Sequence, residues 1–114
     1  LRQAPVLIQI HGGGWTIGNK EQQGLLLMNR MAREGWVCVS ANYRLGALGC
    51  FDLSALSTPE HEIDDNLYLR DLIMALRWVR ENIAVFGGDP DNVTIFGESA
   101  GAHPEEYPAP GQVV

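Results

Sequence analysis

Three short segments rich in apolar residues recur along the chain. The first, Val6–Ile10, is almost continuously apolar and is followed by a run of glycines. Strands that are buried on both faces of a parallel sheet show this pattern. Two further segments of the same kind cover residues 36–41 and 93–96. The pattern therefore predicts three strands, the first of them buried on both faces.

Helical periodicity marks the segments between these strands. From Leu69 to Ile83, apolar residues recur at steps of three and four while charged residues fall outside the stripe. This spacing predicts an amphipathic helix that ends before the next strand. A second helix is predicted over about residues 20–34, with Asn19 as its N-terminal cap and Gly35 at its end.

The order of these elements predicts the fold class. Strands that are joined by helical crossovers lie parallel, so an α/β fold with a parallel sheet core is expected. Residues 42–63 show little periodicity and contain several Gly, Ser and Pro residues, so we expect a long surface loop there. Residues 1–103 are predicted to form the central part of one domain, and the Pro-rich segment 104–114 is predicted to be irregular.

The composition narrows the choice of partners. Of 114 residues 46% are hydrophobic, which is enough for a folded core. With 14 acidic and 8 basic residues the formal net charge is −6, so nucleic acid and anionic membranes are poor partners. No apolar stretch approaches the roughly 20 residues that span a bilayer. We expect a small, uncharged or weakly polar substrate, no metal ion and no cofactor.

The two cysteines are predicted to be free thiols. Cys38 lies in an apolar run and Cys50 follows Gly49. Neither has the spacing of a C-x-x-C motif or of a metal site, so both are expected to pack as small apolar side chains rather than to form a disulfide.

A candidate nucleophile directly follows the third predicted strand. Residues 97–101 read Gly-Glu-Ser-Ala-Gly and match G-x-S-x-G, the strained strand-to-helix turn that lifts a serine hydroxyl above a sheet. Glycines at both ends of the motif let the turn pack closely against its neighbours. The motif predicts Ser99 as a catalytic nucleophile; a plain glycine turn or a phosphate-binding turn is the alternative.

A second motif, His-Gly-Gly-Gly-Trp at residues 11–15, follows the first predicted strand. Attack on an ester carbonyl creates an oxyanion, which needs fixed N–H donors. Consecutive glycines can present such donors without side-chain hindrance at the end of a strand. We predict an oxyanion hole formed by Gly13, Gly14 and Ala100.

Long stretches around these motifs carry a family resemblance. Asn-Tyr-Arg-Leu-Gly-Ala-Leu-Gly at 42–49, Ala-Leu-Arg-Trp-Val-Arg-Glu-Asn-Ile-Ala at 75–84 and residues 86–102 resemble type B carboxylesterases, the cholinesterase-like family. Residues 5–45 also resemble hormone-sensitive-lipase-like bacterial esterases. The resemblance implies a partial α/β-hydrolase fold and a carboxylic ester hydrolase that acts through an acyl-serine intermediate.

The resemblance also implies supporting roles. It pairs Arg44 with Asp71 in a buried ion pair beneath the site, and it gives Glu98 a place in a buried polar network. His11 is expected to orient the glycine loop. Three positions depart from the type B pattern, which usually has Gly, Gln and an aromatic residue where this chain has Tyr68, Leu72 and Cys50 respectively.

A serine nucleophile also needs a histidine base and a carboxylate that orients it. Of the three histidines, His11 belongs to the glycine loop, His61 lies in an acidic part of the long loop, and His103 is expected behind the elbow. In this fold the acid and the base follow the nucleophile, and only residues 100–114 follow Ser99. We therefore expect this truncated chain to be inactive alone.

Two other classes of function remain open from the sequence. A non-catalytic, esterase-like interaction protein would keep the fold without using the serine. An acyltransferase or thioesterase would use the same elbow and differ in which acceptor attacks the acyl-enzyme. Apolar surface left uncovered would favour self-association.

Overall fold

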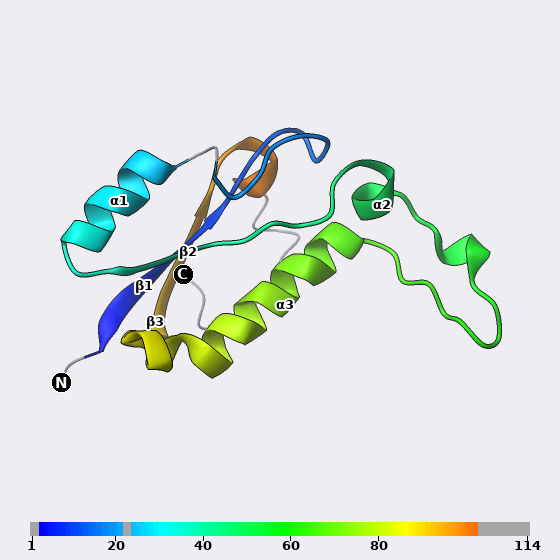
Figure 1. Cartoon of the computed structure of the whole chain (residues 1–114). Coiled ribbons are helices and arrows are strands. Elements are labelled where there is room, and N and C mark those ends of the chain that lie inside the picture. Colours follow the sequence, from blue (N-terminus) through cyan, green and yellow to red (C-terminus); the bar gives the residue numbers. More distant parts are fainter. Residues whose placement is uncertain (1–2, 22–23, 103–114) are drawn as a thin grey trace.

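The structure is a computed structural model that describes residues 3–21 and 24–102. Its centre is a three-stranded sheet with the order β2-β1-β3, formed by β1 (Ala4–Ile10), β2 (Val37–Ser40) and β3 (Gly88–Gly97). The central strand β1 pairs in parallel with both neighbours (Figure 1). The predicted parallel α/β architecture is therefore confirmed.

One face of the sheet holds the main apolar core. Successive strand residues point to opposite faces, so Val6 and Ile8 of β1 share one face. There they pack against Val79 and Ile83, at the end of helix α3 (Leu67–Asn82) and in the following 3-10 turn η2 (Ile83–Phe86). Partly buried aliphatic side chains complete this cluster: Val37, Val39, Leu76, Val93 and Ile95.

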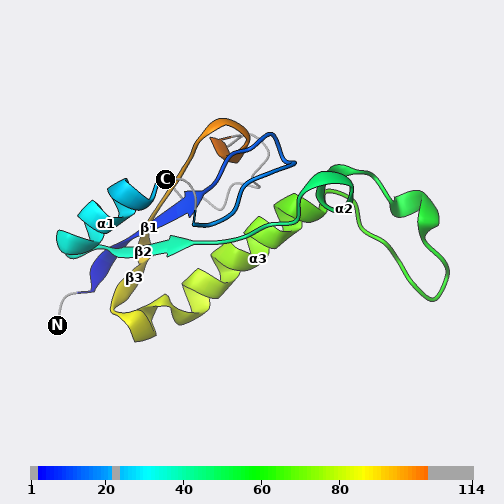
Figure 2. The same cartoon turned by 45° about the horizontal axis from the view of Figure 1, so that its top comes forward.

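The opposite face is covered by helix α1 (Leu25–Arg33). Met28 is the buried residue of α1, and its carbonyl oxygen lies 3.4 Å from the Cys38 Sγ atom of β2. Helices α1 and α3 therefore enclose the sheet from opposite sides (Figures 1 and 2).

Both cysteines are free, as predicted. Within the described residues, no helix has the length and apolarity required to cross a bilayer.

Helix α1 starts later than the sequence pattern predicts. It begins at Leu25 rather than near Lys20, and the residue before it, Gly24, has a left-handed backbone with φ 72°. The Asn19 side chain instead accepts a hydrogen bond from the Glu21 amide at 2.8 Å, so it closes a local turn and the prediction of a helix cap was wrong. The predicted stop at Gly35 agrees with the observed end of the helix.

The third strand starts earlier than predicted. Gly88 already pairs with Ala4, whereas the next register pair joins Val93 to Val6. The turn residues between Gly88 and Val93 are thus accommodated as a bulge within the strand, where the Asp89 side chain accepts from the Asp91 amide. Residues 89–92 are therefore an irregular part of β3 rather than a loop before it.

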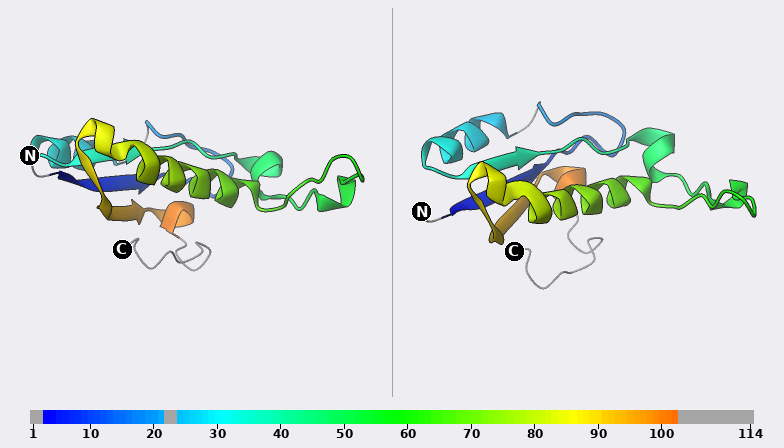
Figure 3. Two further views of the ribbon diagram at one scale, coloured as in Figure 1. Left: turned by 90° about the horizontal axis from the view of Figure 1, so that it is seen from below. Right: turned by 60° about the horizontal axis from the view of Figure 1, so that its bottom comes forward.

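The long connection between β2 and α3 is only partly irregular. It contains the short helix α2 (Gly46–Cys50) and the 3-10 turn η1 (Ser54–Leu56), neither of which was predicted. Beyond α2 the connection extends away from the sheet (Figure 3). The molecule consequently measures 50 × 26 × 22 Å along its principal axes.

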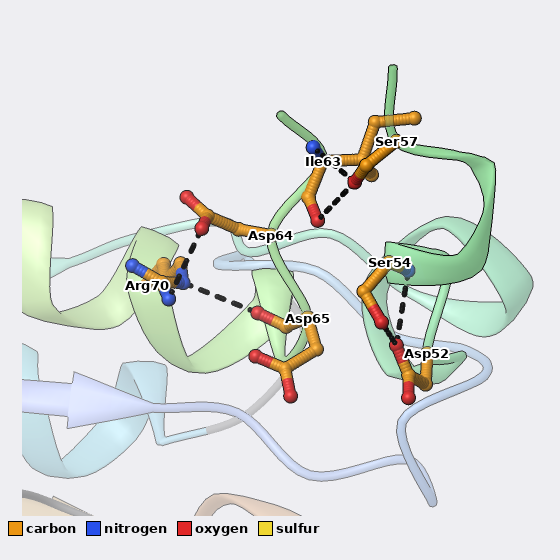
Figure 4. Close-up of polar contacts among 7 residues, drawn as sticks. All are labelled: Asp52, Ser54, Ser57, Ile63, Asp64, Asp65 and Arg70. Carbon is orange, nitrogen blue, oxygen red and sulfur yellow. Dashed lines mark hydrogen bonds and ion pairs between the residues drawn. The ribbon is translucent and has the colours of Figure 1, made fainter. Parts of the chain in front are cut away.

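Polar contacts close the base of this extended loop (Figure 4). Arg70 of α3 lies 3.3 Å from the Asp64 carboxylate and donates to the Asp65 carbonyl at 3.2 Å. The Ser57 hydroxyl accepts from the Ile63 amide at 2.8 Å. These contacts are exposed, so they shape the loop without forming a core.

Truncating Val79, which is 2% exposed, should test the core. We expect Val79→Ala to lower the free energy of unfolding by about 2 kcal/mol, because it removes buried methyl groups and leaves a cavity. Val85→Ala is the matched control, since Val85 is 87% exposed, and should change stability by less than about 0.5 kcal/mol. Chemical denaturation measures both, and equal losses would contradict the proposed core.

Candidate active site

The two predicted catalytic motifs begin at the same edge of the sheet. Ile10, the last residue of β1, is in register with Gly97, the last residue of β3. The glycine loop at 11–15 and the serine turn at 98–101 therefore leave neighbouring strands side by side (Figure 1). Carboxyl ends of parallel strands are the usual ligand-binding edge of an α/β sheet.

The serine turn has the backbone geometry of a nucleophile elbow. Ser99 has φ 54°, a left-handed conformation that costs about 1 kcal/mol or more for a residue with a side chain. Its side chain is exposed, whereas Ala100 is buried. A Cβ atom at Gly97 would overlap the Gly101 carbonyl, and one at Gly101 would overlap the Ile10 carbonyl. Glycine is therefore required where the turn packs against β1.

The glycine loop makes a tight turn of its own. Gly13 has φ 120° and Gly14 has φ 62°. The amides of Thr16 and Ile17 both donate to the Gly13 carbonyl at 3.2 Å. A Cβ atom at Gly13 would overlap the Ile17 carbonyl, so this position has neither the backbone conformation nor the space for another residue.

His11 is packed inside the protein. It is 1% exposed, and its ring stacks on Tyr43 with centroids 4.4 Å apart and planes inclined by 18°. Its Nδ1 atom lies 2.8 Å from the Gly12 carbonyl oxygen. His61 lies in a backbone turn with Thr58 in the extended loop, and His103 lies outside the described residues.

Arg44 and Asp71 pair as the resemblance implies, but the pair is not buried. The guanidinium donates to both carboxylate oxygens at 2.8 Å, and the Arg44 amide donates to Oδ2 at 2.9 Å. The side chains are 49% and 25% exposed, because an open hollow lined by Met74 and Trp78 lies beside them. Hydrogen bonds from the Arg44 side chain lower the pKa of the Asp71 carboxyl, against an opposing effect of burial.

Glu98 also differs from its expected place. The resemblance puts it in a buried polar network, yet Glu98 is exposed. The turn directs Ala100 and Gly101 inwards, and the residues before them, Glu98 and Ser99, face solvent.

The three departures from the type B pattern lie around one aromatic residue, Trp15. The Tyr68 ring meets it edge-on at 6.3 Å, and the Cys50 Sγ atom lies 3.8 Å from its carbonyl oxygen. Leu72 is buried in a second apolar cluster with Ile10 and Tyr43, and Trp15 and Tyr68 pack against this cluster. The unusual residues thus form one consistent packing environment beside the glycine loop.

Sequence reasoning gave no role to Tyr43, although it lies in the quoted Asn-Tyr-Arg motif. Its hydroxyl donates to the His11 carbonyl, and burial raises the pKa of the phenol. An aromatic residue with a polar group shortly after a predicted strand was the available signal. Across the described residues, no group of three or more His, Cys, Asp or Glu side chains could hold a metal ion.

A parallel sheet with a glycine loop after one strand and a strained serine turn after the adjacent strand defines the α/β-hydrolase class. The model of the carboxylesterase family matches residues 1–104 in one span. The chain belongs to this family, which confirms the resemblance to type B carboxylesterases.

Known relatives support the same family. The chain is 48% identical to Esterase LipQ from Mycobacterium tuberculosis over 102 residues, covering 90% of this chain and 21% of the relative. It is 48% identical to the para-nitrobenzyl esterase of Bacillus subtilis over 101 residues, covering 88% of this chain and 20% of the relative. A solved thermophilic PNB esterase superposes with a TM-score of 0.75 at 47% identity, over 88% of this chain and 20% of that one. The chain thus spans about a fifth of the length of these relatives.

Neutralising Asp71 should change the pH dependence of stability. Because its pKa is lowered in the folded state, the carboxylate stabilises the protein above its unfolded pKa of about 4, and this contribution is lost as the pH falls through the lower folded value. We expect Asp71→Asn to flatten the loss of stability below about pH 4 in denaturation measured across pH.

Asp64→Asn is the control for this experiment, since Asp64 has a single half-exposed contact with Arg70. At neutral pH it should change the free energy of unfolding by less than about 0.5 kcal/mol, because an exposed ion pair contributes little. Parallel profiles for Asp71→Asn and the unaltered protein would contradict a structural role for the Arg44 pair.

Adding a methyl group at Gly13 should perturb the glycine loop beyond the effect of its backbone angle. Gly13→Ala meets both a positive φ and the Ile17 carbonyl, whereas Gly35→Ala meets a positive φ of 92° in open space. Gly35→Ala should cost about 1–2 kcal/mol of stability. Gly13→Ala should cost clearly more, or shift the amide resonances of residues 12–17; equal effects in both variants would count against the described loop.

Proposed function

We propose that the chain carries the nucleophile and the oxyanion hole of a carboxylic ester hydrolase. Ser99 is the proposed nucleophile, and the N–H groups of Gly13, Gly14 and Ala100 are the proposed oxyanion donors. The observation that carries this proposal is the left-handed backbone of Ser99 in a turn that packs directly on the strand leading into the glycine loop.

The proposed reaction forms and breaks an acyl-serine. The Ser99 hydroxyl oxygen attacks the ester carbonyl while its proton passes to a base, and the carbonyl oxygen becomes an oxyanion that accepts hydrogen bonds from backbone N–H groups. Each such donor contributes about 3 kcal/mol to lowering the barrier. Collapse of this intermediate breaks the bond to the alkoxide, which takes that proton and leaves as the alcohol, so the acyl group stays on Ser99. Water then attacks the acyl-serine, which releases the carboxylic acid and returns a proton to the Ser99 oxygen.

The proposal assigns no base to Ser99 within residues 3–21 and 24–102. His11 is buried against Tyr43 and belongs to the loop, and the extended segment that carries His61 leads away from the sheet (Figure 1). A serine hydroxyl without a base is a weak nucleophile. The described residues by themselves should therefore turn over an ester slowly or not at all.

The same proposal includes two statements about partners. An excess of acidic over basic residues, 14 against 8, disfavours nucleic acid as a ligand. Large apolar side chains exposed to solvent include Leu26 of α1 and, in η2, the consecutive residues Val85 and Phe86. Exposed apolar side chains of this kind favour self-association, which light scattering over a range of concentrations would detect.

Labelling with a fluorophosphonate probe tests the nucleophile. Since Ser99 is exposed but has no base among the described residues, we expect the probe to modify it slowly and only at high probe concentration. Ser99→Ala should abolish this labelling without a large change in stability, because the residue is exposed. Ser54→Ala is the control, since Ser54 is an exposed serine of the extended loop whose hydroxyl contacts only Asp52 among the described contacts. Its labelling should equal that of the unaltered chain.

Mass spectrometry of the labelled protein and hydrolysis of a short p-nitrophenyl ester give the two readouts. Undiminished labelling of Ser99→Ala would contradict the assignment of the nucleophile. A chain that is never labelled would favour a non-catalytic interaction protein. Competition between water and added alcohols or amines for the acyl group would separate a hydrolase from an acyltransferase.

A further inference from the structure

The first residue of the glycine loop, His11, is contacted by a residue that follows the neighbouring strand. Tyr43 follows β2, and its hydroxyl donates to the His11 carbonyl while its ring stacks on the His11 ring. Both residues are buried. Burial raises the pKa of the phenol, so the hydroxyl keeps its proton and remains a donor at neutral pH.

The last residue of the loop, Trp15, is contacted by the same segment after β2. The Gly46 amide donates to the Trp15 carbonyl at 2.6 Å. Residues 43 and 46 thus contact the two ends of the loop at 11–15, and the three glycines lie between these contacts.

The segment that makes both contacts is itself anchored to α3. Between Tyr43 and Gly46 lies Arg44, whose amide and guanidinium donate three hydrogen bonds to the Asp71 carboxylate. Contacts therefore run from α3 through Asp71 and Arg44 to the segment, and from the segment to both ends of the glycine loop.

An oxyanion hole works only if its donors are fixed before the reaction. Consecutive glycines have more backbone freedom than any other sequence, so a loop that contains three of them loses much entropy when it is ordered. Within the loop, the His11 Nδ1 atom lies 2.8 Å from the Gly12 carbonyl oxygen, and the amides of Thr16 and Ile17, which follow the loop, donate to the Gly13 carbonyl. These local contacts do not tie the loop to the neighbouring elements. Fixing the loop therefore depends on contacts from outside it.

We propose that residues 43–46 form a clamp that fixes the oxyanion loop, with Tyr43 as its positioning residue and Asp71 as its anchor. This inference rests on the proposed function for the role of the loop. It assigns a task to the Tyr43 hydroxyl, and it gives the exposed Arg44–Asp71 pair the role of holding the segment that contacts the loop.

Tyr43→Phe tests the clamp, because it removes the hydroxyl and keeps the ring that stacks on His11. Ser40→Ala is the matched control. The Ser40 hydroxyl also donates to a backbone carbonyl, that of Lys20 at 2.9 Å, but this carbonyl lies outside the loop. Each variant therefore loses one hydroxyl-to-carbonyl hydrogen bond, and only Tyr43→Phe loses one that holds the loop.

Amide hydrogen exchange in the full chain, followed by NMR, is the main readout because it needs no activity. We expect the Thr16 and Ile17 amides of Tyr43→Phe to exchange about tenfold faster than those of Ser40→Ala, a difference of about 1.4 kcal/mol. The His11 carbonyl carbon resonance should shift upfield in Tyr43→Phe alone. Equal exchange at Thr16 and Ile17 in the two variants would overturn the clamp.

A second variant keeps the proposal testable if Tyr43→Phe does not fold. Asp71→Ala leaves Tyr43 intact and removes the anchor, so exchange of Thr16 and Ile17 should again be faster than in Ser40→Ala. Unchanged exchange in Asp71→Ala would refute the anchoring role.

The rate of labelling of Ser99 by the fluorophosphonate separates the clamp from the proposed function. If the unaltered chain is labelled, we expect Tyr43→Phe to be labelled about tenfold more slowly than Ser40→Ala. Faster exchange without slower labelling would show that the clamp does not serve the oxyanion hole and would overturn its positioning role. If the unaltered chain is not labelled, the proposed function fails, and the exchange comparison still decides the clamp.

Discussion

The parallel register between β1 and β3 is the constraint on which the rest of the site depends. It places Ile10 beside Gly97, so that a glycine loop and a serine turn leave adjacent strands at the same edge. The close approach of Gly101 to the Ile10 carbonyl then joins the two motifs directly. A shift of one residue in this register would turn the side chains of β3 to the other face and separate the motifs. The aliphatic face that packs on α3 holds the register, because only one register buries it.

A loop of consecutive glycines is stabilised differently from a cluster of packed side chains. Side chains are held by their own packing, whereas a run of glycines has nothing to pack. Here Tyr43 and Gly46 contact the ends of the loop, and the Asp71 carboxylate holds the segment between them. The strength of the Arg44–Asp71 pair comes from three converging hydrogen bonds rather than from burial, since exposed ion pairs by themselves contribute little.

Local residue types also explain how the unusual positions fit together. Tyr68, Cys50 and Leu72 surround Trp15 and the second apolar cluster, so each departure from the family pattern is matched by its neighbours. Departures that are distant in sequence but adjacent in space act as one packing unit, and double-mutant cycles on such groups are generally non-additive.

The sequence by itself determined the strands, the amphipathic α3, the parallel topology and both glycine motifs, because periodicity and turn residues are local properties of the chain. It also predicted the family, since the motifs around Ser99 and at residues 42–49 are long and specific. The late start of α1, the bulge at Gly88, the helix α2, and the exposed positions of Glu98 and of the Arg44–Asp71 pair were decided by tertiary structure. The contact of the Tyr43 hydroxyl with His11 belongs to the same group, because it joins residues 32 positions apart. Which partner a polar group finds across that distance depends on how the strands pair, and no local pattern encodes it.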